Sequence, residues 1–106
     1  MSALPDLDQI RDAAARIAPY AVVTPVLRSA RLDALAGAEL HFKCENLQRG
    51  GAFKFRGACN AVWSLDDEQA ARGVVTHSSG NHGNALAMAA ATRGITAHVV
   101  VPAGAV

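Results

Sequence analysis

The feature that most constrains the fold is an alternation of strand patterns with helix patterns along the second part of the sequence. Residues 73–77 and 95–102 are short apolar runs typical of strands, and residues 84–93 between them are typical of a helix. Upstream, residues 39–46 alternate apolar and polar side chains like a strand, and residues 54–65 repeat apolar side chains at helical spacing. This order predicts an α/β fold with right-handed crossovers and a parallel sheet covered by helices on both faces.

Capping residues indicate where the remaining helices begin and end. A first helix is predicted to follow an Asp6 cap, and Ser29 is predicted to cap a short helix that ends at Gly37. Asp66, with Gln69 three residues on, is predicted to form a capping box for another short helix.

Composition and charge exclude several classes of function. The chain has 106 residues, 51% of them hydrophobic, and a net charge of +1, so we expect a globular protein with no nucleic-acid partner. No apolar run approaches the roughly 20 residues needed to cross a bilayer, so no membrane partner is expected, and the first residues do not resemble a signal peptide. Cys44 and Cys59 form no CxxC pair, which indicates free thiols in a reducing cytoplasm and no zinc site or disulfide framework.

Two glycine-containing loops follow predicted strands and precede predicted helices. They are RGGAFK, residues 49–54, and HSSGNHG, residues 77–83. In open α/β sheets ligands bind outside the carboxyl ends of the strands, where both loops are expected to lie. Each loop therefore offers free backbone N–H groups and the positive end of a helix dipole to an anion.

Lys54 in the first loop is the candidate nucleophile. It lies at the start of its predicted helix between Phe53 and Phe55, and both the helix dipole and the apolar neighbours disfavour its charged form. A neutral amine attacks aldehydes and forms a Schiff base. The alternative is a lysine whose side chain passes the two rings to reach solvent, and Lys54 taken alone favours this alternative.

The second loop strengthens the prediction of a ligand site. Ser78 and Ser79 offer hydroxyl groups, Asn81 offers an amide, and Gly80 and Gly83 allow a ligand to approach the backbone closely. Such a loop can hold a carboxylate or a phosphate. The alternative is an ordinary helix start in which Ser79 or Asn81 is the cap. Two loops of this kind at one sheet edge favour a ligand site.

The segment KCENLQRGGAFKFRGA followed by THSSGNHGNALA resembles the fold-type II pyridoxal-phosphate enzymes, in particular the branch of serine racemase and the serine/threonine dehydratases. TPVLRSARLD and VVVP fit the same pattern, so the resemblance runs from about Ile10 to Pro102. It implies a three-layer α/β fold with a parallel sheet of the tryptophan synthase β-like class. Residues 1–106 would be an incomplete N-terminal part of the pyridoxal-phosphate-binding catalytic region of a longer enzyme, inactive alone, with the phosphate cradle beyond Val106.

The resemblance also implies a role for each candidate residue. Lys54 would carry pyridoxal 5'-phosphate as a Schiff base and take the Cα proton of the substrate on one face. Phe53 would lie against the cofactor, and Asn81 would hydrogen-bond its ring hydroxyl. Ser79 would face the opposite side of the substrate and deliver a proton there, as racemisation requires. The substrate-binding residues would be Ser78, Ser79, Asn81 and His82.

These roles predict an ammonia-lyase that removes water and then ammonia from β-hydroxy amino acids such as serine and threonine. The alternatives are a serine racemase or a threo-3-hydroxyaspartate dehydratase, because Ser79 stands where biosynthetic threonine dehydratases commonly carry alanine. A further alternative, of another class, is a truncated chain without catalysis. A nucleic-acid-binding loop built on the single RGG is disfavoured by the near-zero charge.

Other implied features concern the whole protein. The resemblance implies an amino acid substrate, a homo-oligomer, and Mg²⁺ and ATP as effectors, with the metal ligands outside this chain. Arg49 falls where racemase-like relatives have a basic residue near a nucleotide site at a subunit interface. Ala52 departs from the family, which often has serine there, and so removes a hydroxyl near the cofactor.

Overall fold

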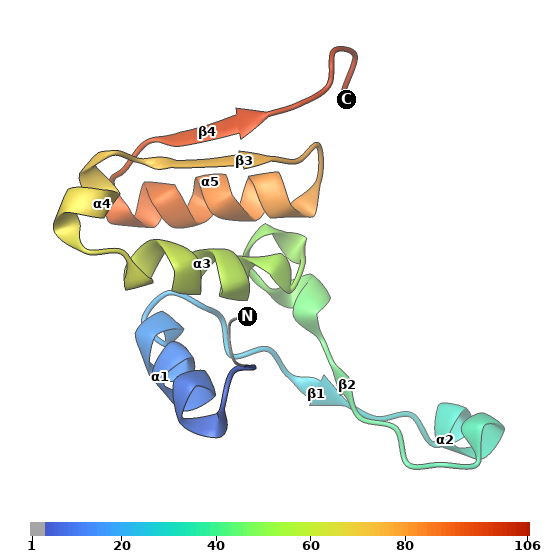
Figure 1. The fold of residues 1–106 in the computed structure, drawn as a ribbon. Helices are drawn as coiled ribbons and strands as arrows, with labels where there is room; N and C mark the ends of the chain where they lie inside the picture. The colour runs from blue at the N-terminus through green and yellow to red at the C-terminus, as the bar shows by residue number, and fades with distance from the viewer. Residues whose placement is uncertain (1–3) are drawn as a thin grey trace.

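The computed structural model describes residues 4–106 and has two helices, α3 (Lys54–Ser64) and α5 (Asn81–Arg93), packed side by side at its centre (Figure 1). Their C-terminal ends lie together, because Trp63 Nε1 donates a hydrogen bond to Thr92 Oγ1 over 3.3 Å. The two helices run parallel, so their N-terminal ends also lie at one end of the molecule (Figure 1).

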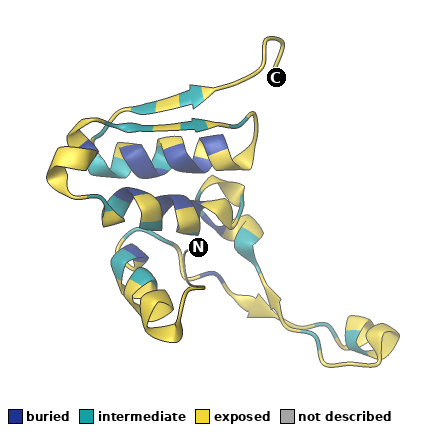
Figure 2. Ribbon diagram, viewed as in Figure 1, coloured by how far each residue is buried: buried dark blue, intermediate teal, exposed yellow. Residues whose placement is uncertain are grey.

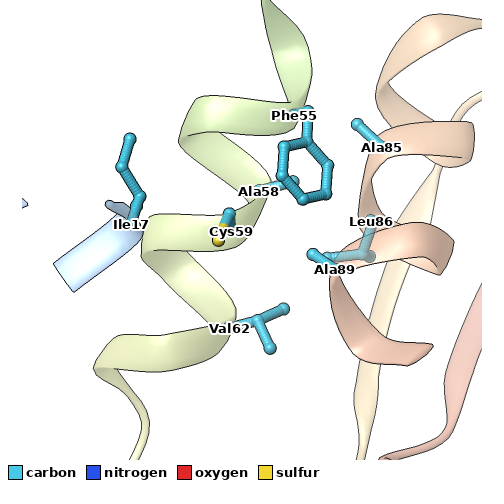
Figure 3. Packing of buried hydrophobic residues seen from close by; sticks show 8 residues of the cluster. All are labelled: Ile17, Phe55, Ala58, Cys59, Val62, Ala85, Leu86 and Ala89. Carbon is cyan, nitrogen blue, oxygen red and sulfur yellow. The ribbon is translucent and has the colours of Figure 1, made fainter. Parts of the chain in front are cut away.

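The hydrophobic core lies mainly between these two helices. In Figure 3 the ring of Phe55 projects from α3 toward Ala85 of α5, and Val62 projects toward Ala89. Alanine side chains on α5 leave room for the larger side chains of α3, so the two backbones approach each other closely. The buried cluster consists of Ile17, Phe55, Ala58, Cys59, Val62, Ala85, Leu86 and Ala89.

The parallel sheet has two strands, β3 (Val74–His77) and β4 (Ala97–Val100), which are joined through α5. The predicted strands and their parallel pairing are confirmed. The helix α5 packs against both strands, and Val75 on β3 is 71% exposed. Intermediate and exposed residues alternate along both strands (Figure 2). Within residues 4–106, helices therefore cover one face of this sheet, whereas the sequence predicted cover on both.

The strand predicted at residues 39–46 is shorter than expected and has a different partner. Its strand portion is β2 (Phe42–Lys43), which pairs antiparallel with β1 (Val26–Leu27) in a separate sheet. The prediction that these residues join the parallel sheet is wrong, because an alternating pattern identifies a strand but not the strand beside it. The two strands and α2 (Ala30–Ala36) form an arm that projects from the central helices (Figure 1).

The predicted helix caps are confirmed. The helix α1 (Leu7–Ile17) follows a capping box at Asp6 and packs on α3, and α4 (Asp67–Ala71) follows the second predicted box. Ser29 caps α2, which ends at Gly37 in the left-handed conformation. None of the helices described within residues 4–106 is long and apolar enough to span a membrane.

Both cysteines are free thiols, as the sequence predicted. Cys44 is partly exposed near the arm, whereas Cys59 is fully buried in the core. Burial raises the pKa of the Cys59 thiol, an effect that the positive charge of Arg49 only partly offsets. Cys59 is therefore a packing residue of the core and is protected from reaction in the folded chain.

Candidate active site

Lys54 is the first residue of α3, and its side chain is exposed. Its Nζ lies 5.4 Å from the centre of the Phe53 ring, which is itself 62% exposed. Among residues 4–106, no carboxylate lies within ion-pair distance of this amine. The structure thus presents a primary amine beside an accessible aromatic face.

The second aromatic neighbour of Lys54 points elsewhere. Phe55 is fully buried between α3 and α5 (Figure 3), and the Arg49 guanidinium lies 4.9 Å from its ring centre. Successive residues of a helix point about 100° apart, so neighbours in sequence need not share an environment. The expectation that two rings flank and desolvate Lys54 is therefore wrong, and Phe53 alone lies beside it.

The loop that leads into Lys54 packs directly on α5. Gly50 and Gly51 have φ values of 73° and 72°, a conformation that other residues rarely adopt. A Cβ on Gly50 would lie 3.1 Å from both Asn84 Nδ2 and Met88 Sδ of α5. Glycine at this position allows the close approach that brings the start of α3 to the first turns of α5.

The second predicted loop is partly helical. The helix α5 begins at Asn81, three residues before its predicted start at position 84, so Asn81, His82 and Gly83 form its first turn. Asparagine, histidine and glycine have weak helix propensity, which is why the sequence pattern predicted a loop here. The tertiary position of this turn, at the end of β3, overrides that local preference.

Gly80 is the N-cap residue of α5, and Ser78 supplies a side-chain acceptor for the Gly83 N–H of its first turn. The Ser78 Oγ accepts hydrogen bonds from the Gly83 N–H at 3.0 Å and from the Gly80 N–H at 3.3 Å. The alternative in which Ser79 or Asn81 is an ordinary cap is therefore wrong. Ser78 contributes to the site by fixing the shape of the loop, and the Ser79 hydroxyl remains available for other contacts.

The first turn of α5 provides donors for an anion. The backbone N–H groups of Asn81 and His82 have no acceptor among residues 4–106, as expected at a helix start. No atom lies within 4 Å of a Cβ built on Gly80, and Asn81 is exposed. A hollow of about 360 Å³ adjoins Ser78 and Ser79 but not Asn81 or His82. The unpaired N–H groups at the start of α5 can nevertheless bind a carboxylate, as helix N-termini do.

The candidate residues do not all share one hollow. His82 lines a second hollow of about 500 Å³, bounded by α3, β3 and α5, whereas Ser78 and Ser79 line the first. Lys54 lines neither hollow, but it is the first residue of α3, and α3 and α5 begin at the same end of the molecule (Figure 1). The structure thus brings the two serines together and sets Lys54 and His82 on neighbouring helix starts.

The sequence patterns missed a polar network beside the loop that leads into Lys54. Arg56 Nε donates to Glu45 Oε1 at 2.6 Å, and Gln48 Nε2 donates to Glu45 Oε2 at 3.2 Å. Burial alone raises the pKa of the Glu45 carboxyl, but hydrogen bonds from Arg56 and Gln48, with the charges of Arg56 and Lys43, lower it below its ordinary value overall. The only sequence signal is that Glu45 and Arg56 flank the candidate lysine.

The known proteins that resemble this chain point to one enzyme family. The family model described as "Pyridoxal-phosphate dependent enzyme" matches residues 17–106. Serine racemase of Arabidopsis thaliana is 63% identical over 94% of this chain and 30% of its own length. The beta-hydroxyaspartate dehydratase of Paracoccus denitrificans is 54% identical over 93% of this chain and 31% of its own. The chain thus spans about 30% of the length of these curated relatives.

Solved structures agree with this result. Serine racemase from Dictyostelium discoideum superposes with a TM-score of 0.92 and 55% identity, over 94% of this chain and 33% of its own. The T.th. threonine deaminase superposes with a TM-score of 0.79 and 37% identity, over 92% of this chain and 38% of its own. These neighbours confirm the predicted α/β fold class.

Proposed function

Because the chain belongs to the pyridoxal-phosphate dependent enzymes, in the fold-type II branch of serine racemase, we propose that it forms the lysine-bearing side of an active site for β-hydroxy amino acids. The proposed reactions are loss of water and ammonia and, at the same site, racemisation. One observation carries the proposal: Lys54 and Asn81 begin two parallel helices at one end of the molecule, and Ser78 and Ser79 lie in the loop that leads into Asn81 (Figure 1).

The residues present fit the aldehyde and the ring of pyridoxal phosphate. Lys54 offers an exposed amine without a carboxylate partner among residues 4–106, Phe53 offers an exposed ring face, and Asn81 offers an exposed amide for the ring hydroxyl. When bound, the cofactor withdraws electrons from Cα of the attached amino acid and so weakens the Cα–H bond. We assign Lys54, Phe53 and Asn81 to holding it.

Lys54 and the start of α5 have complementary tasks in this proposal. The Lys54 amine, in its neutral form, takes the Cα proton from one face of the substrate. The backbone N–H groups of Asn81 and His82 receive the substrate carboxylate, helped by the positive end of the α5 dipole. Ser78 supports this contact by holding the Gly80 and Gly83 N–H groups in the loop.

Ser79 distinguishes the two proposed outcomes. Loss of the Cα proton and the β-hydroxyl, followed by hydrolysis, gives a 2-oxo acid and ammonia. Racemisation requires a proton to return on the face opposite Lys54. The hydroxyl of Ser79 is exposed and makes no hydrogen bond within residues 4–106, in contrast to that of Ser78, which supports Ser79 as this donor. The relatives named racemase and hydroxyaspartate dehydratase are consistent with either outcome.

Other proposals concern the whole protein. We propose a cytoplasmic homo-oligomer, with Mg²⁺ and ATP as effectors and with metal ligands outside residues 1–106. Arg49 already donates a hydrogen bond to Tyr20 O at 3.2 Å and lies over the Phe55 ring. A nucleotide contact at Arg49 would therefore use the guanidinium N–H groups that remain.

The function is tested in a chimaera in which this chain replaces the corresponding 30% of Arabidopsis thaliana serine racemase. The purified chimaera is supplied with pyridoxal phosphate and L-serine, and pyruvate and D-serine are measured separately. We expect both products, their loss in Lys54→Ala, and their retention in the control Lys43→Arg. Ser79→Ala should lower D-serine formation by about 10²- to 10⁴-fold, the usual effect of a catalytic proton donor, with a smaller effect on pyruvate.

A folded chimaera that binds pyridoxal phosphate but converts neither serine, threonine nor 3-hydroxyaspartate would contradict the proposed function. Equal losses of both products in Ser79→Ala would contradict the assignment of Ser79 to the second face.

A further inference from the structure

We propose that Glu45 and Arg56 are positioning residues for Lys54. Gln48 and Arg56, which Glu45 holds in an ion pair, attach the two ends of segment 48–56 to the backbone of Val22. These attachments fix the direction in which the Lys54 amine leaves α3. The proposal rests on the proposed function, because it concerns how the same lysine is presented to the aldehyde of the cofactor.

The ion pair itself is short and shielded. Arg56 Nε lies 2.6 Å from Glu45 Oε1, and the two side chains are 32% and 17% exposed. Among residues 4–106 it is the only ion pair in which both side chains are less than a third exposed. Charge-assisted hydrogen bonds in such surroundings are stronger than those between fully solvated side chains.

The second attachment is the buried side chain of Gln48, which is 3% exposed. Its Nε2 donates to Val22 O and its Oε1 accepts from the Val22 N–H, both at 2.9 Å. The side-chain amide thus pairs with both main-chain groups of Val22, as the backbone of an adjacent β-strand would. Arg56 Nη2 also donates to Val22 O, at 3.2 Å. Gln48 and Arg56 therefore donate to the same carbonyl oxygen, that of Val22.

Lys54 lies between these two attachments. The segment from Gln48 to Arg56 contains Gly50 and Gly51, whose positive φ values show that the backbone here relies on glycine. Glycine loses the most conformational freedom on ordering, so such a segment needs fixed ends to hold one shape. The Arg56 ion pair provides the fixed end nearest to Lys54, at the first turn of α3.

The test measures how fast pyridoxal phosphate becomes attached to Lys54. It uses the full chain with the substitution Lys43→Arg, which leaves Lys54 as the only lysine. The attachment is trapped with borohydride and the labelled peptide is quantified by mass spectrometry, in native buffer and in urea. The ratio of the native rate to the rate in urea reports how well the fold presents the amine.

In this background we compare Glu45→Gln, which keeps the size of the side chain and removes its charge, with Arg56→Met and Arg56→Lys. The matched control is Glu68→Gln, which removes an exposed ion pair with Arg72 on α4. Far-UV circular dichroism and Trp63 fluorescence establish that each variant is folded. If Arg56→Met does not fold, the labelling ratio of the near-isosteric Glu45→Gln variant alone tests the positioning role.

We expect the reference chain to label Lys54 faster when native than in urea. Glu45→Gln and Arg56→Met should lower this ratio about tenfold, Arg56→Lys should recover part of it, and Glu68→Gln should leave it unchanged. Folded Glu45→Gln and Arg56→Met with the full ratio would overturn the positioning role and leave the proposed function intact. A reference chain with no native advantage would overturn the positioning role, because the fold would then not present the amine, whereas the proposed function is tested separately in the chimaera.

Discussion

At the scale of single residues, two adjacent serines have different environments. The Ser78 hydroxyl accepts two backbone hydrogen bonds, whereas the exposed Ser79 hydroxyl makes none within residues 4–106. The sequence pattern placed both serines in a candidate ligand loop. It could not distinguish their roles, because only the folded loop brings the Ser78 hydroxyl to the Gly83 N–H.

Replacing Ser78 by alanine removes the side-chain acceptor for the Gly83 N–H. The free energy of unfolding should fall by about 1 kcal/mol, the usual cost of a lost helix cap. Urea unfolding followed by Trp63 fluorescence measures it. Ser79→Ala is the matched control and should change the same quantity by less than about 0.5 kcal/mol. Equal effects of the two substitutions would refute the assignment to Ser78 of the acceptor for the first turn of α5.

Gly83 is required by close packing of α5 against the sheet. A Cβ at this position would lie 2.9 Å from Ser78 O and 2.9 Å from Val99 Cγ1. We therefore expect Gly83→Ala to destabilise the fold by about 1–3 kcal/mol, as overpacked substitutions do. Gly80→Ala, with no atom within 4 Å of its added Cβ, provides the comparison in thermal unfolding. If the Gly83→Ala and Gly80→Ala proteins were equally stable, the expected clash of the added Cβ with Ser78 O and Val99 Cγ1 would be contradicted.

At the scale of elements, the loop before α3 should make stability depend on pH. Glu45 has a pKa below its ordinary value in the folded chain, so folding favours its ionised form. The resulting stabilisation is present above the ordinary carboxyl pKa and is lost as the pH falls through the lowered one. The free energy of unfolding should therefore drop in this acidic range.

Glu45→Gln identifies the source of this dependence. The difference in free energy of unfolding between the parent chain and Glu45→Gln should be largest near neutral pH and should shrink as the pH falls through the Glu45 pKa. Urea titrations at a series of pH values measure it, with Glu68→Gln as an exposed carboxyl control. A difference that stays constant down to acidic pH would exclude Glu45 as the titrating group.

The helix caps could be predicted from the sequence, whereas the strand pairing could not. The caps at Asp6, Ser29 and Asp66 were predictable, because a cap and its helix lie within a few residues of each other. The pairing of β2 with β1 was not, because strand partners are chosen by tertiary contacts. The same holds for Gln48 and Val22, whose hydrogen bonds join positions 26 residues apart.

At the scale of the whole molecule, the fold class was predictable and the shape was not. The alternation of strand and helix patterns predicted the parallel pair and its crossover helix. The radius of gyration is 16.7 Å, against about 13 Å for a compact domain of similar length, because the arm that carries α2 projects from the centre (Figure 1). Hydrophobic periodicity alone does not report such an arm.

The candidate site, like the fold, was only partly predictable from the sequence. The sequence identified Lys54 and the SSGN segment, because a lysine and serines beside glycines at strand-to-helix connections are unusual enough to be noticed. It could not show that Phe55 turns into the core or that His82 lines a separate hollow, since both depend on which helix face meets α3 or α5.

The role of Lys54 as the amine that binds pyridoxal phosphate is tested by a visible absorption spectrum of the chain with this cofactor, before and after borohydride reduction. We expect a Schiff-base band that borohydride removes, with the label found at Lys54 by peptide mapping. The band should be lost in Lys54→Ala and kept in Lys43→Arg. Equal bands and equal labelling in the parent chain and Lys54→Ala would contradict this role of Lys54.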